Sequence, residues 1–205
     1  RIGYAEAMTP GKRLFDLFWA LLGLLLLAPL LLAVAVAIRL DDGGPAFFRQ
    51  RRVGRGGRPF RIWKFRTMVQ NAEALGGQIT VGGDPRITRV GRWLRRTKLD
   101  ELPQLFNVLA GEMSLVGPRP EVPRYVARYT PAQRRVLDLP PGITDPASIK
   151  YRDENAVLAR AADPDRAYVD EIMPEKLRLN LAYADRRSLA GDVVVILHTL
   201  ARLLR

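Results

Sequence analysis

The sequence has 205 residues and a formal net charge of +12, with 33 Lys and Arg residues against 21 Asp and Glu residues. It contains no cysteine and one histidine, which excludes disulfides, thiolate catalysis and cysteine-ligated metals and argues against a Ser-His-Asp hydrolase. The length suffices for one domain with a modest core, and any chemistry must rest on Asp, Glu, Lys and Arg side chains, with or without a bound metal.

The excess positive charge is confined to one quarter of the chain. Residues 49–98 contain 14 cations and two acids, whereas the segments before and after them are each neutral. So uneven a distribution indicates an anionic partner, such as the phosphates of a lipid, a nucleotide or a nucleic acid.

An apolar run precedes the basic segment. Residues 17–38 read LFWALLGLLLLAPLLLAVAVAI, without a charged side chain. About 20 apolar residues suffice to cross a bilayer as a helix, so this run is predicted to be a membrane segment. A cleaved signal peptide is the weaker alternative, because the apolar part of a typical signal is shorter.

The flanks and the proline of this run argue against a simple span. Lys12 and Arg13 precede it and Arg39 follows it, which favours both ends on the cytoplasmic face. Pro29 follows Ala28 near the middle, where proline removes an amide donor and kinks a helix. A helix bent at this point can enter one leaflet and return on the same side.

We therefore predict a re-entrant membrane helix over about residues 12–39, with a straight span as the alternative. This helix belongs to an N-terminal segment of residues 1–42. The remaining residues, 43–205, are predicted to form a cytoplasmic, membrane-associated domain.

Two short strands are predicted directly after the membrane segment. Residues 46–53 and 59–66 flank Gly56 and Gly57, which are typical of a turn between antiparallel strands. Arginines are mixed with aromatic residues along both strands, a composition that suits nucleic acid or a lipid headgroup layer. Beside a membrane helix we favour lipid phosphates, and we expect no nucleic-acid partner.

The rest of the chain is predicted to be mostly helical. A helix that begins near Thr88 places Trp93 and two aliphatic residues on one face among arginines, as in an interfacial amphipathic helix; an ordinary surface helix is the alternative. Further helices are predicted before Gly111, over residues 174–183 and at the C-terminus, the last one capped by Asp192. The predicted fold class is thus α+β, mostly helical, with a small hairpin.

Asp100 and Glu101 stand side by side between the basic segment and an apolar helix face. One interpretation is helix capping, because Thr97 and Asp100 fit the pattern T-x-x-D. Adjacent side chains on a helix diverge by roughly 100°, so the carboxylates can instead act separately around one centre, as a nucleophile and a metal ligand. Nearby cations are expected to keep Asp100 ionised and to attract a phosphorylated substrate. Aspartate can form an acyl-phosphate, and Mg²⁺ binds carboxylates together with substrate phosphates.

The chain resembles the bacterial sugar transferases known as monotopic phosphoglycosyl transferases. The matching segments, in family order from about Lys12 to Thr144, are KRLFDLFWALLGLLLLAPLLL, RRVGRGGRPFRIWKFRTM, DPRITRVGRWLRRTKLDELPQLFNVLAGEMSLVGPRP and PGIT. The unit LDELPQLFNVL…MSLVGPRP is specific to that family, unlike an isolated Asp-Glu pair.

The resemblance implies transfer of a sugar 1-phosphate from a nucleotide-diphosphate sugar, by expectation a UDP-sugar, to polyprenyl phosphate. The family's nucleophile maps to Asp100, which implies an aspartyl-phosphosugar intermediate and release of a nucleoside monophosphate. Glu101 matches the partner acid, a Mg²⁺ ligand or a proton acceptor, so Asp100 and Glu101 are the candidate metal site. Lys64 and Arg119 match phosphate-binding positions, and Arg95, about one turn before the pair, is a further candidate.

The implied partners are the nucleotide sugar, polyprenyl phosphate and membrane lipids, with Mg²⁺ as cofactor and a homodimer left open. The implied location is the bacterial inner membrane, with the catalytic domain on its cytoplasmic face at the first membrane step of a glycan pathway. An alternative is a membrane-anchored module that binds anionic lipid or nucleic acid without catalysis, and a membrane adaptor for a partner protein is another. Both alternatives leave LDELPQ and GPRP unexplained.

Two positions depart from the family pattern. Ala28 stands where the family often has a serine that supports the membrane bend, so the bend loses one support. The loop after PGIT also differs, and its Asp145, Lys150 and Arg152 are assigned either to sugar or nucleotide choice or to a simple loop role.

Overall fold

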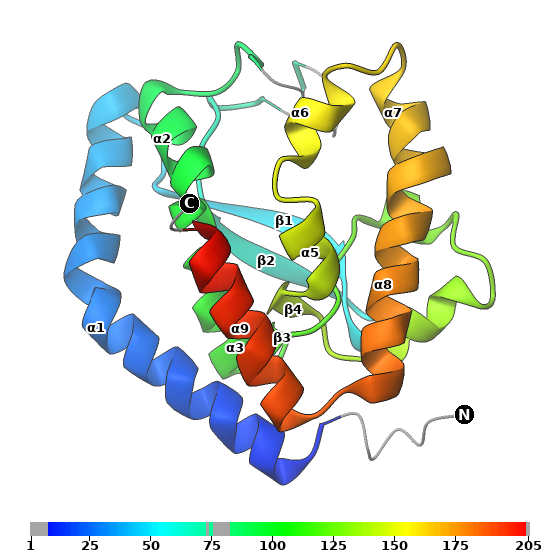
Figure 1. Cartoon of the computed structure of the whole chain (residues 1–205). Helices are drawn as coiled ribbons and strands as arrows, with labels where there is room; N and C mark the ends of the chain where they lie inside the picture. Colours follow the sequence, from blue (N-terminus) through cyan, green and yellow to red (C-terminus); the bar gives the residue numbers. More distant parts are fainter. Residues whose placement is uncertain (1–7, 73, 76–82, 204–205) are drawn as a thin grey trace.

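The computed structural model describes residues 8–72, 74–75 and 83–203. A long helix, α1 (Pro10–Asp42), runs along one side of the molecule, and the other elements form a body against which it lies (Figure 1). The body combines short helices with one antiparallel and one parallel pair of strands. The prediction of a mostly helical chain with a small hairpin and a long apolar N-terminal helix is confirmed.

The elements that follow α1 are, in chain order, β1 (Phe47–Val53), the 3-10 turn η1 (Arg55–Gly57), β2 (Pro59–Phe65), α2 (Arg89–Thr97), the 3-10 turn η2 (Leu99–Glu101), α3 (Gln104–Ala110), β3 (Ser114–Val116), α4 (Pro123–Val126), the 3-10 helix η3 (Gln133–Asp138), β4 (Gly142–Thr144), α5 (Pro146–Lys150), α6 (Glu154–Leu158), α7 (Pro164–Ala167), the π-helical turn η4 (Tyr168–Ile172), α8 (Met173–Arg186) and α9 (Leu189–Leu203).

The sequence of α1 specifies both of its ends. The side chain of Thr9 accepts a hydrogen bond from the Lys12 amide, and Gly43 ends the helix in the left-handed conformation with φ 73°. Pro29 lies inside the helix, which continues through it, and the axis changes direction near mid-length (Figure 1). The helix is long and apolar enough to cross a membrane. Its path in a membrane stays a prediction.

The C-terminal half of α1 is fastened to the start of the body. The Asp41 carboxylate accepts a hydrogen bond from the Val90 amide at 3.0 Å, and Asp42 forms an ion pair with Arg66. Buried side chains join the two parts beside these contacts: Val34, Ile38, Phe65 and Leu94. Burial of this apolar area stabilises the contact, since each fully buried aliphatic side chain contributes about 1.5–3 kcal/mol.

The N-terminal half of α1 is fastened to a different part of the same body. Arg13 donates to the carbonyl oxygen of Val108, near the C-terminus of α3, at 2.7 Å. The Lys12 ammonium lies 2.7 Å from the Asp16 carboxylate and 2.9 Å from that of Asp192 in α9. Both ends of α1 are thus held by one body.

The predicted cap of the C-terminal helix is wrong. Ser188 supplies the cap of α9, because its hydroxyl accepts a hydrogen bond from the Gly191 amide at 3.1 Å. Asp192 lies in the first turn of α9 and is buried against Lys12, a partner from the other end of the chain.

The predicted hairpin is confirmed to within one residue at each end. Strands β1 and β2 pair antiparallel, from Phe47 opposite Phe65 to Val53 opposite Pro59. The φ angles of Gly56 and Gly57 are 65° and 76°, which glycine adopts without steric cost. The turn therefore forms where the Gly-Gly pair places it.

The parallel pair β3–β4 joins the GPRP and PGIT segments. The Gly142 amide donates to the Pro118 carbonyl and the Gly117 amide to the Thr144 carbonyl, both at 3.0 Å. A Cβ atom at Gly142 would lie 2.0 Å from the Gly117 nitrogen, so only glycine permits this approach. The contact fixes the turn that carries Arg119.

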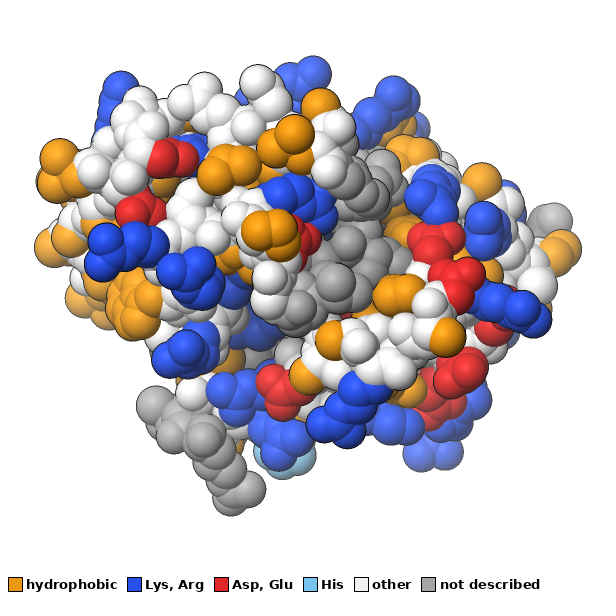
Figure 2. Space-filling view, turned by 90° about the horizontal axis from the view of Figure 1, so that it is seen from above, with side chains coloured by type: hydrophobic (Ala, Val, Ile, Leu, Met, Phe, Trp, Pro, Cys, Tyr) orange, Lys and Arg blue, Asp and Glu red, His pale blue; other side chains and the backbone are white. Residues whose placement is uncertain are grey.

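The exposed side of α1 is apolar, and so is that of α9. Viewed from above, hydrophobic side chains occupy the edge of the molecule where α1 lies, and many of the visible acidic side chains lie on the opposite side (Figure 2). A surface of this kind suits contact with lipid. The predicted interfacial placement of α2 stays a prediction.

Helix α2 begins as predicted at Thr88, whose hydroxyl accepts a hydrogen bond from the Gly91 amide at 3.0 Å. Gly91 packs against the backbone of Thr67, so closely that a Cβ atom would lie 2.1 Å from the Thr67 carbonyl oxygen. We therefore expect Gly91→Ala to lower the free energy of unfolding by about 1–3 kcal/mol, because α2 must move away.

Gly11→Ala is the matched control, since a Cβ atom on this helical glycine of α1 meets no atom within 4 Å. Alanine there is expected to leave the stability unchanged or to raise it by up to about 1 kcal/mol. Thermal unfolding in detergent compares the two variants, and equal melting temperatures would contradict the predicted close packing at Gly91.

Candidate active site

The acidic pair lies in η2, between α2 and α3. Lys98 ends α2 in the left-handed conformation with φ 59°, which redirects the chain before the pair. The capping interpretation is wrong, because neither η2 nor α3 has a side-chain cap, and the Thr97 hydroxyl donates back to the Trp93 carbonyl at 3.0 Å. A side-chain cap therefore does not explain the two acids.

Glu101 forms the centre of a buried ion-pair network. Lys64 of β2 donates to one carboxylate oxygen at 2.8 Å, and Arg119 donates to both oxygens at 2.5 and 3.0 Å. Burial alone would raise the pKa of Glu101, but Arg119 and Lys64 outweigh it and hold the pKa well below its usual range. Glu101 is therefore an anion that holds two cations in place.

Asp100 lies beside this network and differs from Glu101 in its environment. Its side chain is 7% exposed, and its Oδ1 atom has no hydrogen-bond partner. Burial raises the pKa of Asp100, Lys64 opposes the rise and the Glu101 charge adds to it. The shift is thus upward, opposite to the effect expected from the cations alone, because loss of hydration outweighs them.

Arg95 also reaches the site, but through a different contact. Its Nε atom donates to the Thr67 hydroxyl at 2.8 Å, and its charge favours the ionised form of Asp100. Burial lowers the pKa of the Arg95 guanidinium and, in the same way, that of the Lys64 ammonium.

The structure thus brings together the five residues predicted for catalysis and phosphate binding, which are Lys64, Arg95, Asp100, Glu101 and Arg119. Ala28 and Pro29 are exposed residues of α1, and their predicted effect concerns the path of that helix.

Several residues that surround the site were not predicted from the sequence. Arg52 of β1 donates to the Pro120 carbonyl at 3.0 Å and so supports the turn of Arg119. The Asn107 side chain accepts a hydrogen bond from the Trp63 amide at 2.9 Å and thereby fastens α3 to β2. Gln104 is fully buried, and neither atom of its amide group has a partner. Gln104 and Asn107 are the two polar residues within the apolar run LPQLFNVL, and this position could have indicated them in the sequence.

The described residues contain no group of three or more acids or histidines that could hold a metal ion by themselves. Both Glu101 oxygens are engaged by Lys64 and Arg119, whereas the Asp100 Oδ1 atom is buried without a hydrogen-bond partner. This donor set fits a Mg²⁺ ion that takes one carboxylate from the protein and the remaining ligands from substrate phosphates and water.

The loop after PGIT has a structural role at Asp145. This side chain is buried and caps α5 by accepting hydrogen bonds from the amides of Ala147 and Ser148 at 2.8 and 3.0 Å. Lys150 forms an exposed ion pair with Glu175. These contacts favour the loop role over direct recognition of a sugar or nucleotide.

Comparison with known proteins identifies the family of the chain. Residues 7–205 match the family described as bacterial sugar transferase. A protein of Aeromonas hydrophila, named UDP-N-acetylgalactosamine-undecaprenyl-phosphate N-acetylgalactosaminephosphotransferase, is 40% identical over 196 residues, which cover 94% of this chain and 43% of that protein.

Two proteins named UDP-glucose:undecaprenyl-phosphate glucose-1-phosphate transferase are also similar. The one from Caulobacter vibrioides is 40% identical over 204 residues, which cover 94% of this chain and 69% of that protein. The one from Xanthomonas campestris is 39% identical over 198 residues, or 94% of this chain and 38% of that protein. The chain thus spans less than half the length of the Aeromonas and Xanthomonas relatives. Because the match extends over nearly all of its residues, the chain belongs to the bacterial sugar transferase family.

Proposed function

We propose that this chain transfers a sugar 1-phosphate from a nucleoside-diphosphate sugar, most simply a UDP-sugar, to polyprenyl phosphate. The observation that supports this proposal above all is the buried Asp100, whose free carboxylate oxygen lies beside the cations held by Glu101. The names of the relatives, which specify UDP-sugars and undecaprenyl phosphate, agree with that chemistry.

The proposed reaction has two steps at one phosphorus atom. In the first, an Asp100 carboxylate oxygen bonds to the sugar-bearing phosphorus, and the bond from that phosphorus to the oxygen of the nucleoside monophosphate breaks. In the second, an oxygen of polyprenyl phosphate bonds to the same phosphorus and Asp100 leaves as a carboxylate. Neither step needs an oxidant or a net proton transfer, and together the two steps replace one difficult displacement by two easier ones.

The cations have a separate task in both steps. Lys64, Arg119 and Arg95 bind phosphate oxygens and stabilise the charge that develops during transfer. Glu101 positions Lys64 and Arg119, and its low pKa makes it a weak proton acceptor in this arrangement. Bound Mg²⁺ would neutralise the diphosphate, held by Asp100 and the substrate's own oxygens.

The attachment of α1 supports the re-entrant path. Its 33 residues correspond to about 50 Å of helix, longer than the hydrocarbon core of a bilayer. A straight span would separate the two ends of α1 on opposite faces, yet Arg13 and Asp42 bind the same body. We therefore place this body at the cytoplasmic face of the inner membrane, where the nucleotide sugar and the lipid head can both reach Asp100.

The covalent step is tested by Asp100→Asn. This variant keeps the shape of the side chain but removes the nucleophile, so release of nucleoside monophosphate is expected to fall by more than about 10³-fold. Mass spectrometry of the intact protein with donor alone is expected to show a sugar-phosphate adduct in the parent and none in the variant. Full turnover by Asp100→Asn would overturn the covalent mechanism, and no release by the parent with any donor would favour a pure binding function.

The pH dependence of the first step follows from the environment of Asp100. Only the carboxylate attacks, so the rate falls as the pH is lowered through a pKa that lies above the ordinary aspartate value of 3.8. Lys64 opposes that rise, so Lys64→Met is expected to move the acid limb of the profile to higher pH. Lys150→Met, at an exposed ion pair, is the control and should leave the midpoint unchanged. A downward shift in Lys64→Met would contradict the assignment.

The path of α1 is tested by cysteine labelling, for which the cysteine-free sequence is suited. Gly11→Cys reports on the N-terminal end of α1 and Arg58→Cys on the hairpin turn. Both are expected to resist a membrane-impermeant thiol reagent in intact cells and to react after permeabilisation. Labelling of Gly11→Cys alone in intact cells would show that α1 spans the membrane.

A further inference from the structure

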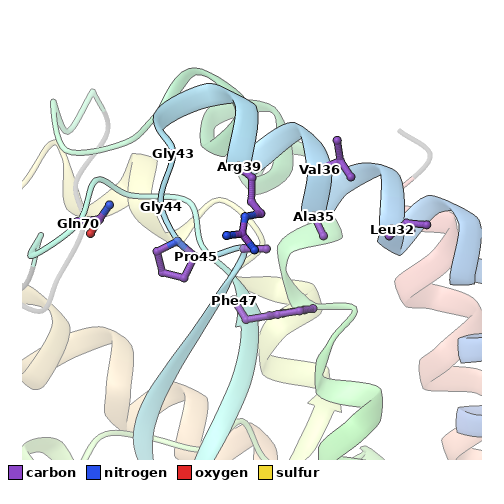
Figure 3. Close-up of a pocket in the computed structure, with 10 residues that line it drawn as sticks. Leu32, Ala35, Val36, Arg39, Gly43, Gly44, Pro45, Phe47 and Gln70 are labelled. Carbon is purple, nitrogen blue, oxygen red and sulfur yellow. The ribbon is translucent and has the colours of Figure 1, made fainter.

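A groove lies between the C-terminal half of α1 and the loop that leads from it into β1. Its volume is about 690 Å³, and its walls include Leu32 and Val36 of α1, Pro45 and Phe47 of the loop and first strand, and Gln70. Figure 3 shows these residues around one opening, with the side chain of Arg39 directed from α1 toward Pro45 and Phe47. The groove is therefore apolar apart from one guanidinium and one amide.

Arg39 is exposed and forms no ion pair within 4 Å with any residue in the described part of the chain. By contrast, the neighbouring Arg66 forms an ion pair with Asp42. Arg66 lies next to Gly44, one of the residues that line the groove. An apolar cavity with one unpaired cation suits a ligand that combines an apolar chain with an anionic head.

The groove continues into the exposed apolar face of the membrane helix. Leu21, Leu25, Leu32 and Val36 follow one another at intervals of four or seven residues, which places them on one side of α1. Each is exposed, and Leu32 is 67% exposed. A lipid chain can therefore pass along α1 into the groove without leaving an apolar surface.

The inner rim of the groove adjoins the strand that carries Lys64. Phe47 pairs with Phe65, the residue after Lys64, and the two rings stack with centroids 5.2 Å apart. The Ala46 carbonyl accepts a hydrogen bond from the Arg66 amide at 2.9 Å. Lys64 precedes Phe65 directly in β2, but successive side chains of a strand point to opposite faces, so the Lys64 side chain lies on the other face of the hairpin.

We propose that this groove is a loading site for polyprenyl phosphate, the acceptor of the proposed reaction, on whose function this inference rests. The first isoprene units lie against Leu32, Val36 and Phe47, and the phosphate contacts Arg39 and the Gln70 amide. Helix α1 exposes apolar side chains over about half of its circumference, so the choice of polyprenyl phosphate over a phospholipid rests on the proposed reaction.

The test compares Arg39→Ala, Val36→Trp and the control Arg58→Ala, an exposed arginine of the hairpin turn. Binding to the purified chain in detergent is titrated by native mass spectrometry with polyprenyl phosphate, polyprenol and phosphatidylglycerol. Arg39→Ala is expected to weaken polyprenyl phosphate binding about tenfold, by the loss of a charge-assisted hydrogen bond, and to leave polyprenol binding unchanged. Val36→Trp fills the groove and should weaken both polyprenyl ligands, whereas Arg58→Ala should weaken neither.

A kinetic measurement separates the groove from the donor site. Arg39→Ala is expected to raise the KM for the lipid acceptor about tenfold and to leave the KM for the nucleotide sugar unchanged. Unchanged polyprenyl phosphate binding in Arg39→Ala, or an equal loss for phosphatidylglycerol, would overturn the proposal. The binding titration needs no donor, so it tests the groove even if the parent chain releases no nucleoside monophosphate and the proposed reaction fails.

Discussion

One buried carboxylate connects the parts of this structure that matter for chemistry. Glu101 accepts hydrogen bonds from Lys64 of β2 and from Arg119 in the turn after β3, so it joins three segments that are distant in the sequence. Removal of one partner from a buried ion pair typically costs about 3–5 kcal/mol, which explains why such a network also fixes local geometry. Two cations around one anion leave positive charge beside Asp100, and a phosphate group would neutralise it.

The adjacent acids thus acquire different properties from their surroundings. Glu101 is stabilised as an anion by Arg119 and Lys64, whereas burial raises the pKa of Asp100. Pairs of acids whose pKa values are moved apart are typical of sites in which each acid has its own task. Here the separation results from the direction of the side chains on η2, because one side chain points to the cations and the other retains an unbonded oxygen.

The features that were predicted correctly from the sequence depend on neighbours along the chain. The hairpin follows from Gly56 and Gly57, and the start of α2 follows from Thr88, since a turn or a cap is a matter of a few residues. Residues assigned by resemblance, such as Lys64 and Arg119, lie together around Glu101, because the motifs that carry them pack together.

The features that could not be predicted depend on contacts between segments that are distant in the sequence or on burial. Asp192 binds Lys12 from the other end of the chain rather than capping its own helix, and no local pattern can indicate that. The position of Arg119 depends on the approach of Gly142 to Gly117, two glycines whose contact is not visible in either motif alone. The pKa of Asp100 is raised by burial, and burial cannot be read from the composition of the sequence.

The ion pair between Lys12 and Asp192 has a consequence for the C-terminus of the chain. Lys12 is shared between Asp16 of its own helix and Asp192 of α9, and Tyr183 of α8 donates to the same Asp192 carboxylate. Helix α9 therefore stabilises the N-terminal end of α1. Loss of α9 would leave Lys12 and Asp16 as an isolated buried ion pair. Truncation of the chain after α8 would consequently weaken the attachment of α1 to the body, although no residue of α9 belongs to the ion-pair network at Glu101.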